Sequence, residues 1–368
     1  MSNQKIFLLI LFIILIFGII FLINQEQNFT NEKPVVKIGV IVPLTKELGF
    51  LGESIQNALF LAKEKLPNTT KYDYQFIFED DQFNSSLTPT AAQKLINIDN
   101  VDAIITFSSN TGNVVSPMTQ THGIVHLGIA SDVIVANGEY NFIHWTQPEE
   151  ESRAFVEELK KRNISKFAFI GLNNQGGKVI IDAIKEDIKQ TNITLVSEEY
   201  HNLTETDFKT HILKAQENNP EIYLLITGSP KLEILTKQIK ELGITTPLTS
   251  IEMFEFTNQP ELFEGTWYIQ AAEPTLSFQT DYNAKFGKLP EQGSANAYDW
   301  FNLLVKSYEE LNRPLNEKPT PLSIAKKISN TVNFPGALGP LNVDENGIVR
   351  SNAIVKQVKN GKFVILTD

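Results

Sequence analysis

The chain of 368 residues contains no cysteine. It therefore forms no disulfide, offers no thiolate to a metal and has no cysteine for lipid attachment. Histidine is scarce as well, and none of the five histidines has the spacing of a metal site. Basic residues number 32 against 43 acidic ones, which gives a net charge of −11. A phosphate backbone would be repelled, so we expect no nucleic acid partner.

Sequence motifs of catalysis are lacking too. There is no G-x-S-x-G elbow and no pair of cysteine and histidine for nucleophilic chemistry. The glycine-bearing run at 171–179 is not a phosphate-binding loop, because its lysine comes one residue late and no Ser or Thr follows. Paired carboxylates are not excluded, but nothing in the sequence singles out a pair. We predict a protein that is not an enzyme and that uses no cofactor or metal.

Residues 6–23 form an unbroken apolar run near the N-terminus. As a helix this run would be about 27 Å long, close to the roughly 30 Å of a bilayer's hydrocarbon core. Lys5 precedes the run while Glu26 and Glu32 follow it, which places residues 1–5 in the cytoplasm and the rest outside. No small-x-small cleavage site is present. The sequence predicts an uncleaved signal anchor with a linker at 24–34, and a cleaved signal peptide is the alternative.

From residue 35 onward, short apolar runs alternate with segments of helical periodicity. Continuous apolar runs are typical of buried parallel strands. The alternation restarts after residue 147, so we predict an α/β fold of two doubly wound, Rossmann-like lobes in tandem. The predicted strands are 35–42, 74–78, 101–107, 124–129, 142–145, 166–171, 194–200, 222–227, 248–250, 266–271 and 338–343, followed by hairpins at 346–347 and 360–362. The predicted helices are 53–66, 90–98, 113–121, 153–162, 178–190, 208–218, 231–242, 278–286, 295–311 and 322–332.

Two polar clusters follow neighbouring predicted strands. Ser108, Ser109, Asn110 and Thr111 come after the first strand, and residues 130–132 come after the second. In open α/β sheets, ligands bind at the carboxyl edge where such strands end. Hydroxyls and free N–H groups at a helix N-terminus suit an anionic group such as a carboxylate. Ordinary loops and helix caps are the alternative interpretation.

A series of motifs resembles the type I periplasmic binding proteins, specifically the leucine/isoleucine/valine-binding family of ABC-transporter receptors. The motifs, in order, are IGVIVPLT (38–45), the acidic strand end at 80–81, AAQKL (91–95), GIVHLGIAS (123–131), ETDF (205–208), NPEIYLLITG (219–228), KLPE with ANAYD (288–299), GALGPLNVDENG (336–347) and VKNGKFV (358–364). The resemblance implies three crossings between lobes joined by a three-stranded hinge. It places lobe 1 at 35–146 plus 273–333 and lobe 2 at 147–272 plus 334–368, with a ligand cleft that closes by hinge motion.

The resemblance also implies binding residues. Members of the family hold an α-carboxylate on hydroxyls and amides of lobe 1, and these positions correspond to Ser109 and Ala130 here. Ser108, Asn110 and Ser131 lie beside them in sequence. The family's acid for the α-ammonium group corresponds to Glu252.

Other positions depart from the family pattern. Asp132 stands where the family has a threonine that helps hold the carboxylate, and an anion there would repel one. Gly176 and Gly228 replace two lobe-2 tyrosines, and Leu51, or Phe50 beside it, replaces a lobe-1 tyrosine. We expect a roomier pocket with an altered charge preference, for a cationic, larger or amide-type ligand. A member that has lost ligand binding is the alternative.

These observations predict an extracytoplasmic, membrane-anchored receptor that delivers an amino acid or related small polar ligand to an ABC permease. A sensory module of the same fold, signalling through a partner protein, is the runner-up hypothesis.

Overall fold

The computed structural model describes residues 33–314 and 317–366 of the chain. The apolar run at 6–23 lies outside these residues. Within the described residues, no helix is long and apolar enough to cross a membrane.

The first lobe is built on a six-stranded parallel sheet with the order β13-β5-β4-β3-β1-β2. Its strands are β1 (Val35–Val42), β2 (Asp73–Asp80), β3 (Ala103–Phe107), β4 (Val125–Ile129), β5 (Asn141–His144) and β13 (Ile348–Val349). Every residue of β3 and β4 is buried. Such continuous apolar strands form because helices cover both faces of the sheet.

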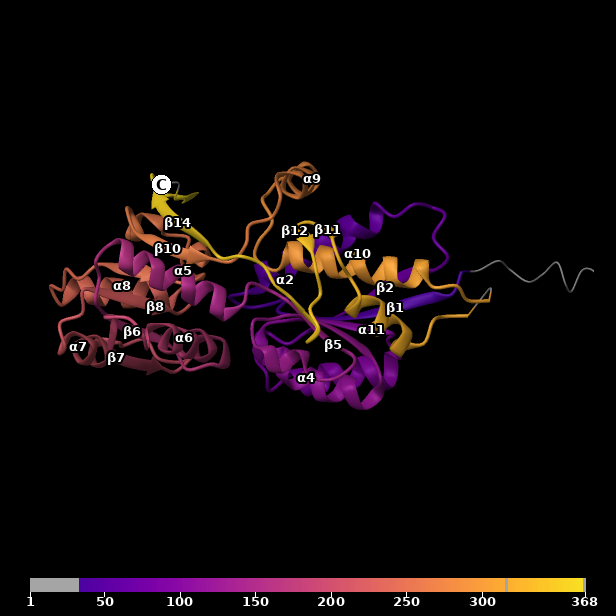
Figure 1. The fold of residues 1–368 in the computed structure, drawn as a ribbon, viewed down its shortest axis with the longest axis horizontal. Helices are drawn as coiled ribbons and strands as arrows, with labels where there is room; N and C mark the ends of the chain where they lie inside the picture. Colours follow the sequence, from indigo (N-terminus) through magenta and orange to yellow (C-terminus); the bar gives the residue numbers. More distant parts are fainter. Residues whose placement is uncertain (1–32, 315–316, 367–368) are drawn as a thin grey trace, which may run out of the picture.

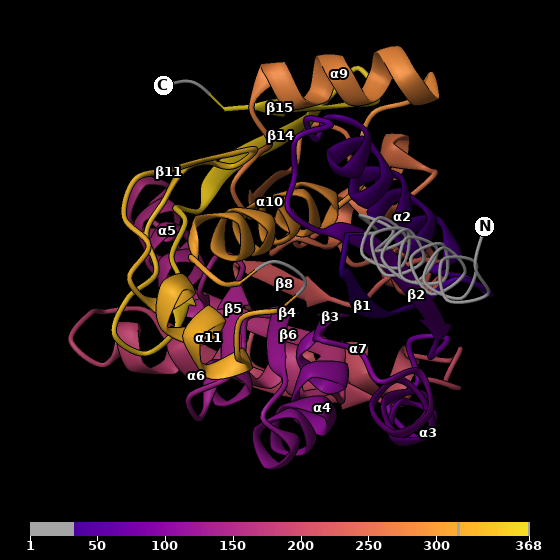
Figure 2. The same ribbon diagram turned by 90° about the vertical axis from the view of Figure 1, so that its right-hand side faces the viewer.

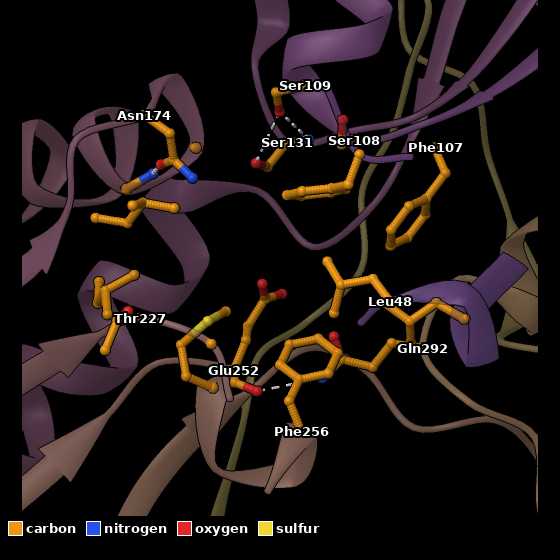
Figure 3. A pocket seen from close by; sticks show the side chains of 18 of the residues that line it. Leu48, Phe107, Ser108, Ser109, Ser131, Asn174, Thr227, Glu252, Phe256 and Gln292 are labelled. Atoms are coloured by element: carbon orange, nitrogen blue, oxygen red, sulfur yellow. Dashed lines mark hydrogen bonds between the residues drawn. The ribbon is translucent and has the colours of Figure 1, made fainter. Parts of the chain in front are cut away.

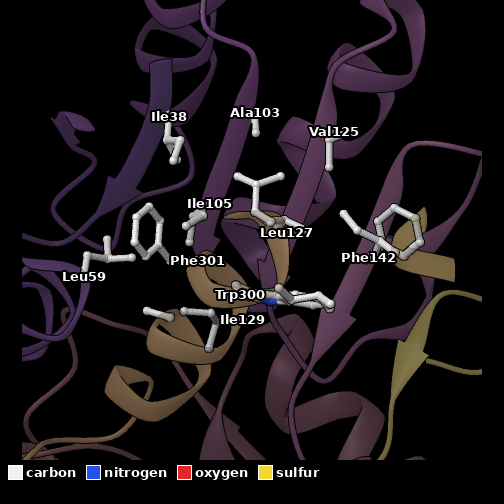
Figure 4. Packing of buried hydrophobic residues seen from close by; sticks show 14 of the residues in the cluster. Ile38, Leu59, Ala103, Ile105, Val125, Leu127, Ile129, Phe142, Trp300 and Phe301 are labelled. Atoms are coloured by element: carbon white, nitrogen blue, oxygen red, sulfur yellow. The ribbon is translucent and has the colours of Figure 1, made fainter. Parts of the chain in front are cut away.

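Helices on the two faces of this sheet complete the lobe (Figure 2). One face is covered by α2 (Gly49–Glu64), α10 (Ser294–Glu310) and α11 (Pro321–Ser329), and the other by α3 (Thr88–Lys94), the π-helical turn η1 (Leu95–Asp99) and α4 (Ser109–His122). Trp300 and Phe301 of α10 pack against the strands, as Figure 4 shows. The indole N–H of Trp300 also donates to the carbonyl of Gly128 at 3.1 Å. α10 is therefore fixed to β4 both by packing and by a buried hydrogen bond.

The second lobe contains a four-stranded parallel sheet with the order β7-β6-β8-β9, next to an antiparallel β10-β14-β15 sheet. A parallel bridge between Ile251 and Ile269 joins the two. The strands are β6 (Lys166–Leu172), β7 (Thr194–His201), β8 (Ile222–Ile226), β9 (Leu248–Ser250), β10 (Trp267–Gln270), β14 (Ile354–Lys359) and β15 (Lys362–Ile365). Helices α5 (Pro148–Lys161) and α6 (Gln175–Ile188) pack on one face, and α7 (Lys209–Gln216) and α8 (Lys231–Glu241) on the other. The predicted doubly wound α/β architecture is confirmed, with the two lobes side by side in Figure 1.

The C-terminal segment differs from the sequence-based prediction. The family resemblance predicts residues 334–349 in the second lobe, yet they lie on the first. The hairpin of β11 (Phe334–Gly336) and β12 (Gly339–Leu341) packs near α10, and β13 pairs in parallel with β5. The predicted hairpin at 346–347 is reduced to one bridge between Val343 and Val349. The chain therefore returns to the second lobe only after residue 349.

The remaining elements are short or lie at the edges of the lobes. They are η2 (Val133–Ala136), η3 (Met253–Phe256), η4 (Pro260–Phe263) and α9 (Leu276–Phe286). Phe278 and Tyr282 of α9 pack on Ala58 and Leu61 of α2. The chain has thus crossed back to the first lobe between β10 and α9.

Three segments connect the lobes in the described part of the chain, at 145–147, 271–274 and 350–353. The buried hydroxyl of Thr146 joins them. It accepts a hydrogen bond from the backbone N–H of Ala272 at 3.0 Å and lies 3.0 Å from the hydroxyl of Ser351. One side chain on the first segment therefore holds both of the others.

We predict that Thr146→Val lowers the free energy of unfolding by about 1–3 kcal/mol, because it leaves the partly buried N–H of Ala272 without its partner. Thr146→Ser keeps the hydroxyl and serves as the control. Urea unfolding of the two variants would measure the difference. A valine variant as stable as the serine variant would contradict this account of the hinge.

Candidate functional site

A cavity between the lobes is lined by the carboxyl ends of strands from both sheets. Its walls are mostly apolar, with Phe83, Phe107, Trp145, Met253 and Phe256 among the lining residues. Most of the predicted binding residues line it: Leu51, Ser108, Ser109, Ala130, Ser131, Gly176, Gly228 and Glu252. Figure 3 shows the serines on one side of the cavity and Glu252 on the opposite side. The fold thus brings distant segments together around one cavity with two polar ends.

Ser109 forms the centre of the first polar end, and we call this end the serine pole (Ser108, Ser109 and Ser131). Ser109 is the first residue of α4, and its hydroxyl oxygen accepts the backbone N–H groups of Ser131 at 3.2 Å and Asp132 at 3.1 Å. Both of these bonds use the oxygen as acceptor. The hydroxyl of Ser131 lies 3.4 Å from that of Ser109, and either of the two can donate to the other or to a ligand. An acceptor such as a carboxylate would find a hydroxyl proton beside the N-terminus of α4.

Ser108 has a structural role at the same pole. Its φ of 86° is rare for a residue other than glycine, and its hydroxyl caps α4 by accepting the N–H of Thr111 at 3.2 Å. Thr111 in turn donates to the buried carboxylate of Asp81 at 2.6 Å. Burial raises the pKa of Asp81 above its ordinary value. This chain of contacts fixes the first turn of α4 and so positions Ser109.

Glu252 forms the opposite polar end. It follows β9 with a φ of 65°, a left-handed conformation that costs of order 1–3 kcal/mol for such a residue. Its side chain is only 8% exposed, and Oε1 accepts the indole N–H of Trp145 at 2.5 Å. Burial raises the pKa of Glu252, although the neighbouring carboxyl of Glu151 and the hydrogen bond from Trp145 oppose this rise. An acid held in a strained, buried position is suited to receive a cationic group in the cleft.

Glu151, which the sequence analysis did not identify, lies against Glu252. It belongs to the first turn of α5 and is fully buried. Burial, and after it the charge of Glu252, raise the pKa of Glu151 well above its ordinary value. A sequence signal did exist, because Glu151, Phe155 and Leu159 are spaced at four-residue intervals along the buried face of this helix. The acid thus occupies a position of the apolar stripe.

Two predicted residues do not line the cavity as the structure describes it, namely Asn110 and Asp132. The side chain of Asp132 is buried and accepts hydrogen bonds from Asn113 Nδ2 at 2.8 Å and from the backbone N–H of Ile134 at 3.0 Å. It caps η2, and only its backbone N–H reaches Ser109. The expected repulsion of a ligand carboxylate by Asp132 stays a prediction, but the carboxylate of Asp132 is bound by Asn113 and Ile134 and does not line the cavity.

The two glycines at the tyrosine positions border open space. A Cβ atom on Gly228 would meet nothing within 4 Å, and one on Gly176 would approach only Asn174 Oδ1, at 3.9 Å. Leu51, on α2 of the first lobe, is buried and lines the same cavity, while the alternative, Phe50, is not part of its wall in the described structure. Larger side chains at residues 176 and 228 would narrow the cavity, so the two glycines make it wider.

Comparisons with known proteins agree with this geometry. The model of a family described as periplasmic binding protein matches residues 35–362. The leucine-binding protein LivK of Thermotoga maritima superposes with a TM-score of 0.78 at 21% identity, covering 90% of this chain and 98% of its own. LivJ of Streptococcus pneumoniae, solved with isoleucine, gives a TM-score of 0.79 at 18% identity, with 91% and 100% coverage.

A third solved structure binds a different ligand. The solute-binding protein of an R. palustris ABC transporter, solved with benzoate, gives a TM-score of 0.79 at 15% identity and covers 90% of this chain and 95% of its own. At these identities the similarity to solved structures establishes the fold alone.

We predict that Gly228→Ala changes the free energy of unfolding by no more than about 0.5 kcal/mol, since the new methyl group enters open space. Gly52→Ala is the contrasting variant. Its Cβ would lie 1.8 Å from the carbonyl oxygen of Pro43, and we expect a loss of about 1–3 kcal/mol. Thermal unfolding of both variants would test this, and equal losses would contradict the open cavity at residue 228.

Proposed function

The chain belongs to the periplasmic binding protein family, and we propose that it captures a small amphiphilic ligand with an amino group, such as an amino acid or a related amine. The observation that carries this proposal is the arrangement of two unlike poles across one apolar cavity. The hydroxyl of Ser109 can donate at one pole, and the carboxyl of Glu252 can receive a cation at the other. The members of the family that this chain resembles are solute-binding receptors and not enzymes.

The energetics of a closed cleft support an amino-group ligand. Desolvating a carboxylate or an ammonium group is costly unless the protein supplies hydrogen bonds or an opposite charge. Glu47 also lines the cavity but is exposed, whereas Glu252 is buried and directs its carboxyl into the cavity. Benzoate, the ligand of the R. palustris protein, carries no cation for such a group. An amino acid such as the isoleucine bound by LivJ has one group for each pole.

The wide cavity favours a ligand larger than leucine, or one with an amide or second cation in its side chain. Gly176 and Gly228 leave room on the second lobe, and Asn174, Thr227 and Ser229 bring polar groups to that side. Apolar residues cover the remaining wall. The side chain of the ligand would therefore extend toward the second lobe.

We propose that the receptor delivers this ligand to an ABC permease, and the hinge between the lobes supports this proposal. Closure of the lobes around a ligand requires flexible connections, and the segments held by Thr146 are the places where bending is expected. The permease would recognise the closed pair of lobes. The apolar run at 6–23 would keep the receptor at the outer face of the membrane.

A thermal-shift screen of amino acids, short peptides, amides and small carboxylates would test the proposed ligand class. A ligand at 100 times its Kd stabilises by about 2.7 kcal/mol, which corresponds to a shift of several degrees at about 2–4 °C per kcal/mol. We expect the shift from amino-group ligands to disappear in Glu252→Gln and to persist in Glu261→Gln, which alters an exposed acid on η4. No shift with any amino-group ligand would contradict the proposal.

The serine pole has its own test. Leucine, isoamylamine and isocaproate share one hydrocarbon chain, but isoamylamine lacks the carboxylate and isocaproate lacks the amino group. We expect Ser109→Ala to weaken leucine binding by about tenfold or more, the value of a hydrogen bond to a charged group, and to leave isoamylamine unchanged. Calorimetric titration would measure both. Equal weakening of the two ligands would show that the variant damages the cleft generally.

A further inference from the structure

Two carboxyl groups, those of Glu151 and Glu252, lie at the cation end of the cleft, and in the described part of the chain neither forms an ion pair with a basic side chain. Glu252 lines the cavity, and Glu151 lies behind it with no exposed surface. Within the described residues, no hydrogen bond of ordinary geometry reaches either carboxyl oxygen of Glu151. Glu252 is the charged group that acts on it, and both carboxyls are buried at this end of the cleft.

The elements packed around this pair supply no compensating cation in the described part of the chain. Asp187 of α6 faces α5 and accepts a hydrogen bond from Ser152. Glu255 of η3 adds a further negative charge near Glu252. Lys356 of β14 is already paired with Glu255 at 2.5 Å and also with Glu273. The surroundings of the pair are therefore net acidic.

Lys231, at the start of α8, also lines the cavity, but within the described residues no ion pair joins it to either acid of the pair. Two adjacent carboxylates that are buried without a cation cannot both stay ionised, so the pair retains a proton. An incoming ammonium group would supply the missing positive charge.

We propose that Glu151 and Glu252 form a two-carboxyl cation site that holds a shared proton in the ligand-free protein and releases it when a cationic ligand binds. On binding, the O–H bond of the shared proton breaks, the proton passes to the solvent, and the ammonium group of the ligand takes over its charge. The charge of the site is unchanged by this exchange. Capture becomes weaker in acid, where protons compete with the cation.

This inference rests on the proposed function for the cationic ligand, but the shared proton itself is testable without any ligand. The pKa of each acid is raised in the folded protein. The protonated pair therefore contributes its full stability below the ordinary pKa of glutamate. This contribution is lost as the pH rises through the raised pKa. Glu151→Gln removes one of the two charges. We therefore expect the ligand-free variant to lose less stability than the wild type as pH rises.

The first experiment follows the full-length, ligand-free protein by its tryptophan fluorescence from about pH 5 to about pH 9. Trp145 reports on the pair because its indole donates a hydrogen bond to Glu252. The fluorescence also contains the emission of Trp267 and Trp300, so the Trp145→Phe variant serves to identify the part that comes from Trp145. We expect a transition in the wild type above the ordinary range of glutamate. The transition should be absent or shifted to lower pH in Glu151→Gln and in Glu252→Gln. An identical titration in wild type and both variants would overturn the shared proton.

The second experiment titrates isoamylamine calorimetrically in phosphate and in Tris buffer, which take up protons with different heats. For the wild type we expect heats that differ between the buffers, showing up to one proton released per ligand, and tighter binding as pH rises. Glu151→Gln should give equal heats in both buffers and a flatter dependence of Kd on pH. Equal heats for the wild type would overturn the exchange. A wild type that binds no amine would overturn the cation site together with the proposed function, while the fluorescence titration decides separately on the shared proton.

Discussion

The burial of parallel strands on both faces is the constraint on which this structure depends. A strand such as β3, with all of its residues buried, can offer a ligand only its ends. In each lobe the carboxyl ends of the parallel strands meet at one edge, and both edges border the same cavity. The polar chemistry of the protein therefore gathers where the sheets stop and the helices begin. The hinge at Thr146 keeps the two edges facing one another.

Strain and buried charge are concentrated at the same place. Ser108 and Glu252, at opposite poles of the cavity, both have a positive φ. Left-handed conformations at such residues persist only where the surrounding structure imposes them. At Ser108 the cap of α4 imposes it, and at Glu252 the contacts to Trp145 and Gln292 hold the acid toward the cavity. Stability is thereby given up locally to fix the direction of functional groups.

Some motifs that carry the family resemblance serve the fold and not the ligand. Asp299, the last residue of the ANAYD motif, accepts backbone N–H groups from Ala337 and Leu338 in the GALGP motif. It also lies 3.4 Å from His144, at the end of β5. The two motifs are thus the two sides of one buried contact beside the hinge. Their presence indicates the architecture and contains little information about the ligand.

The sequence alone determined the strands and helices, because strong apolar runs and helical periodicity are local properties. It also determined the polar residues at the strand ends, and Ser109 and Glu252 do face one cavity. The tertiary structure decided the rest. Residues 334–349 join the first lobe through pairing with β5, which no local pattern encodes. Asp132 turns toward Asn113 and away from the cavity because it caps η2, and Glu151 meets Glu252 because two helices and a strand end converge. Periodicity predicts which residues of an element share a face, whereas long-range packing alone decides what that face contacts.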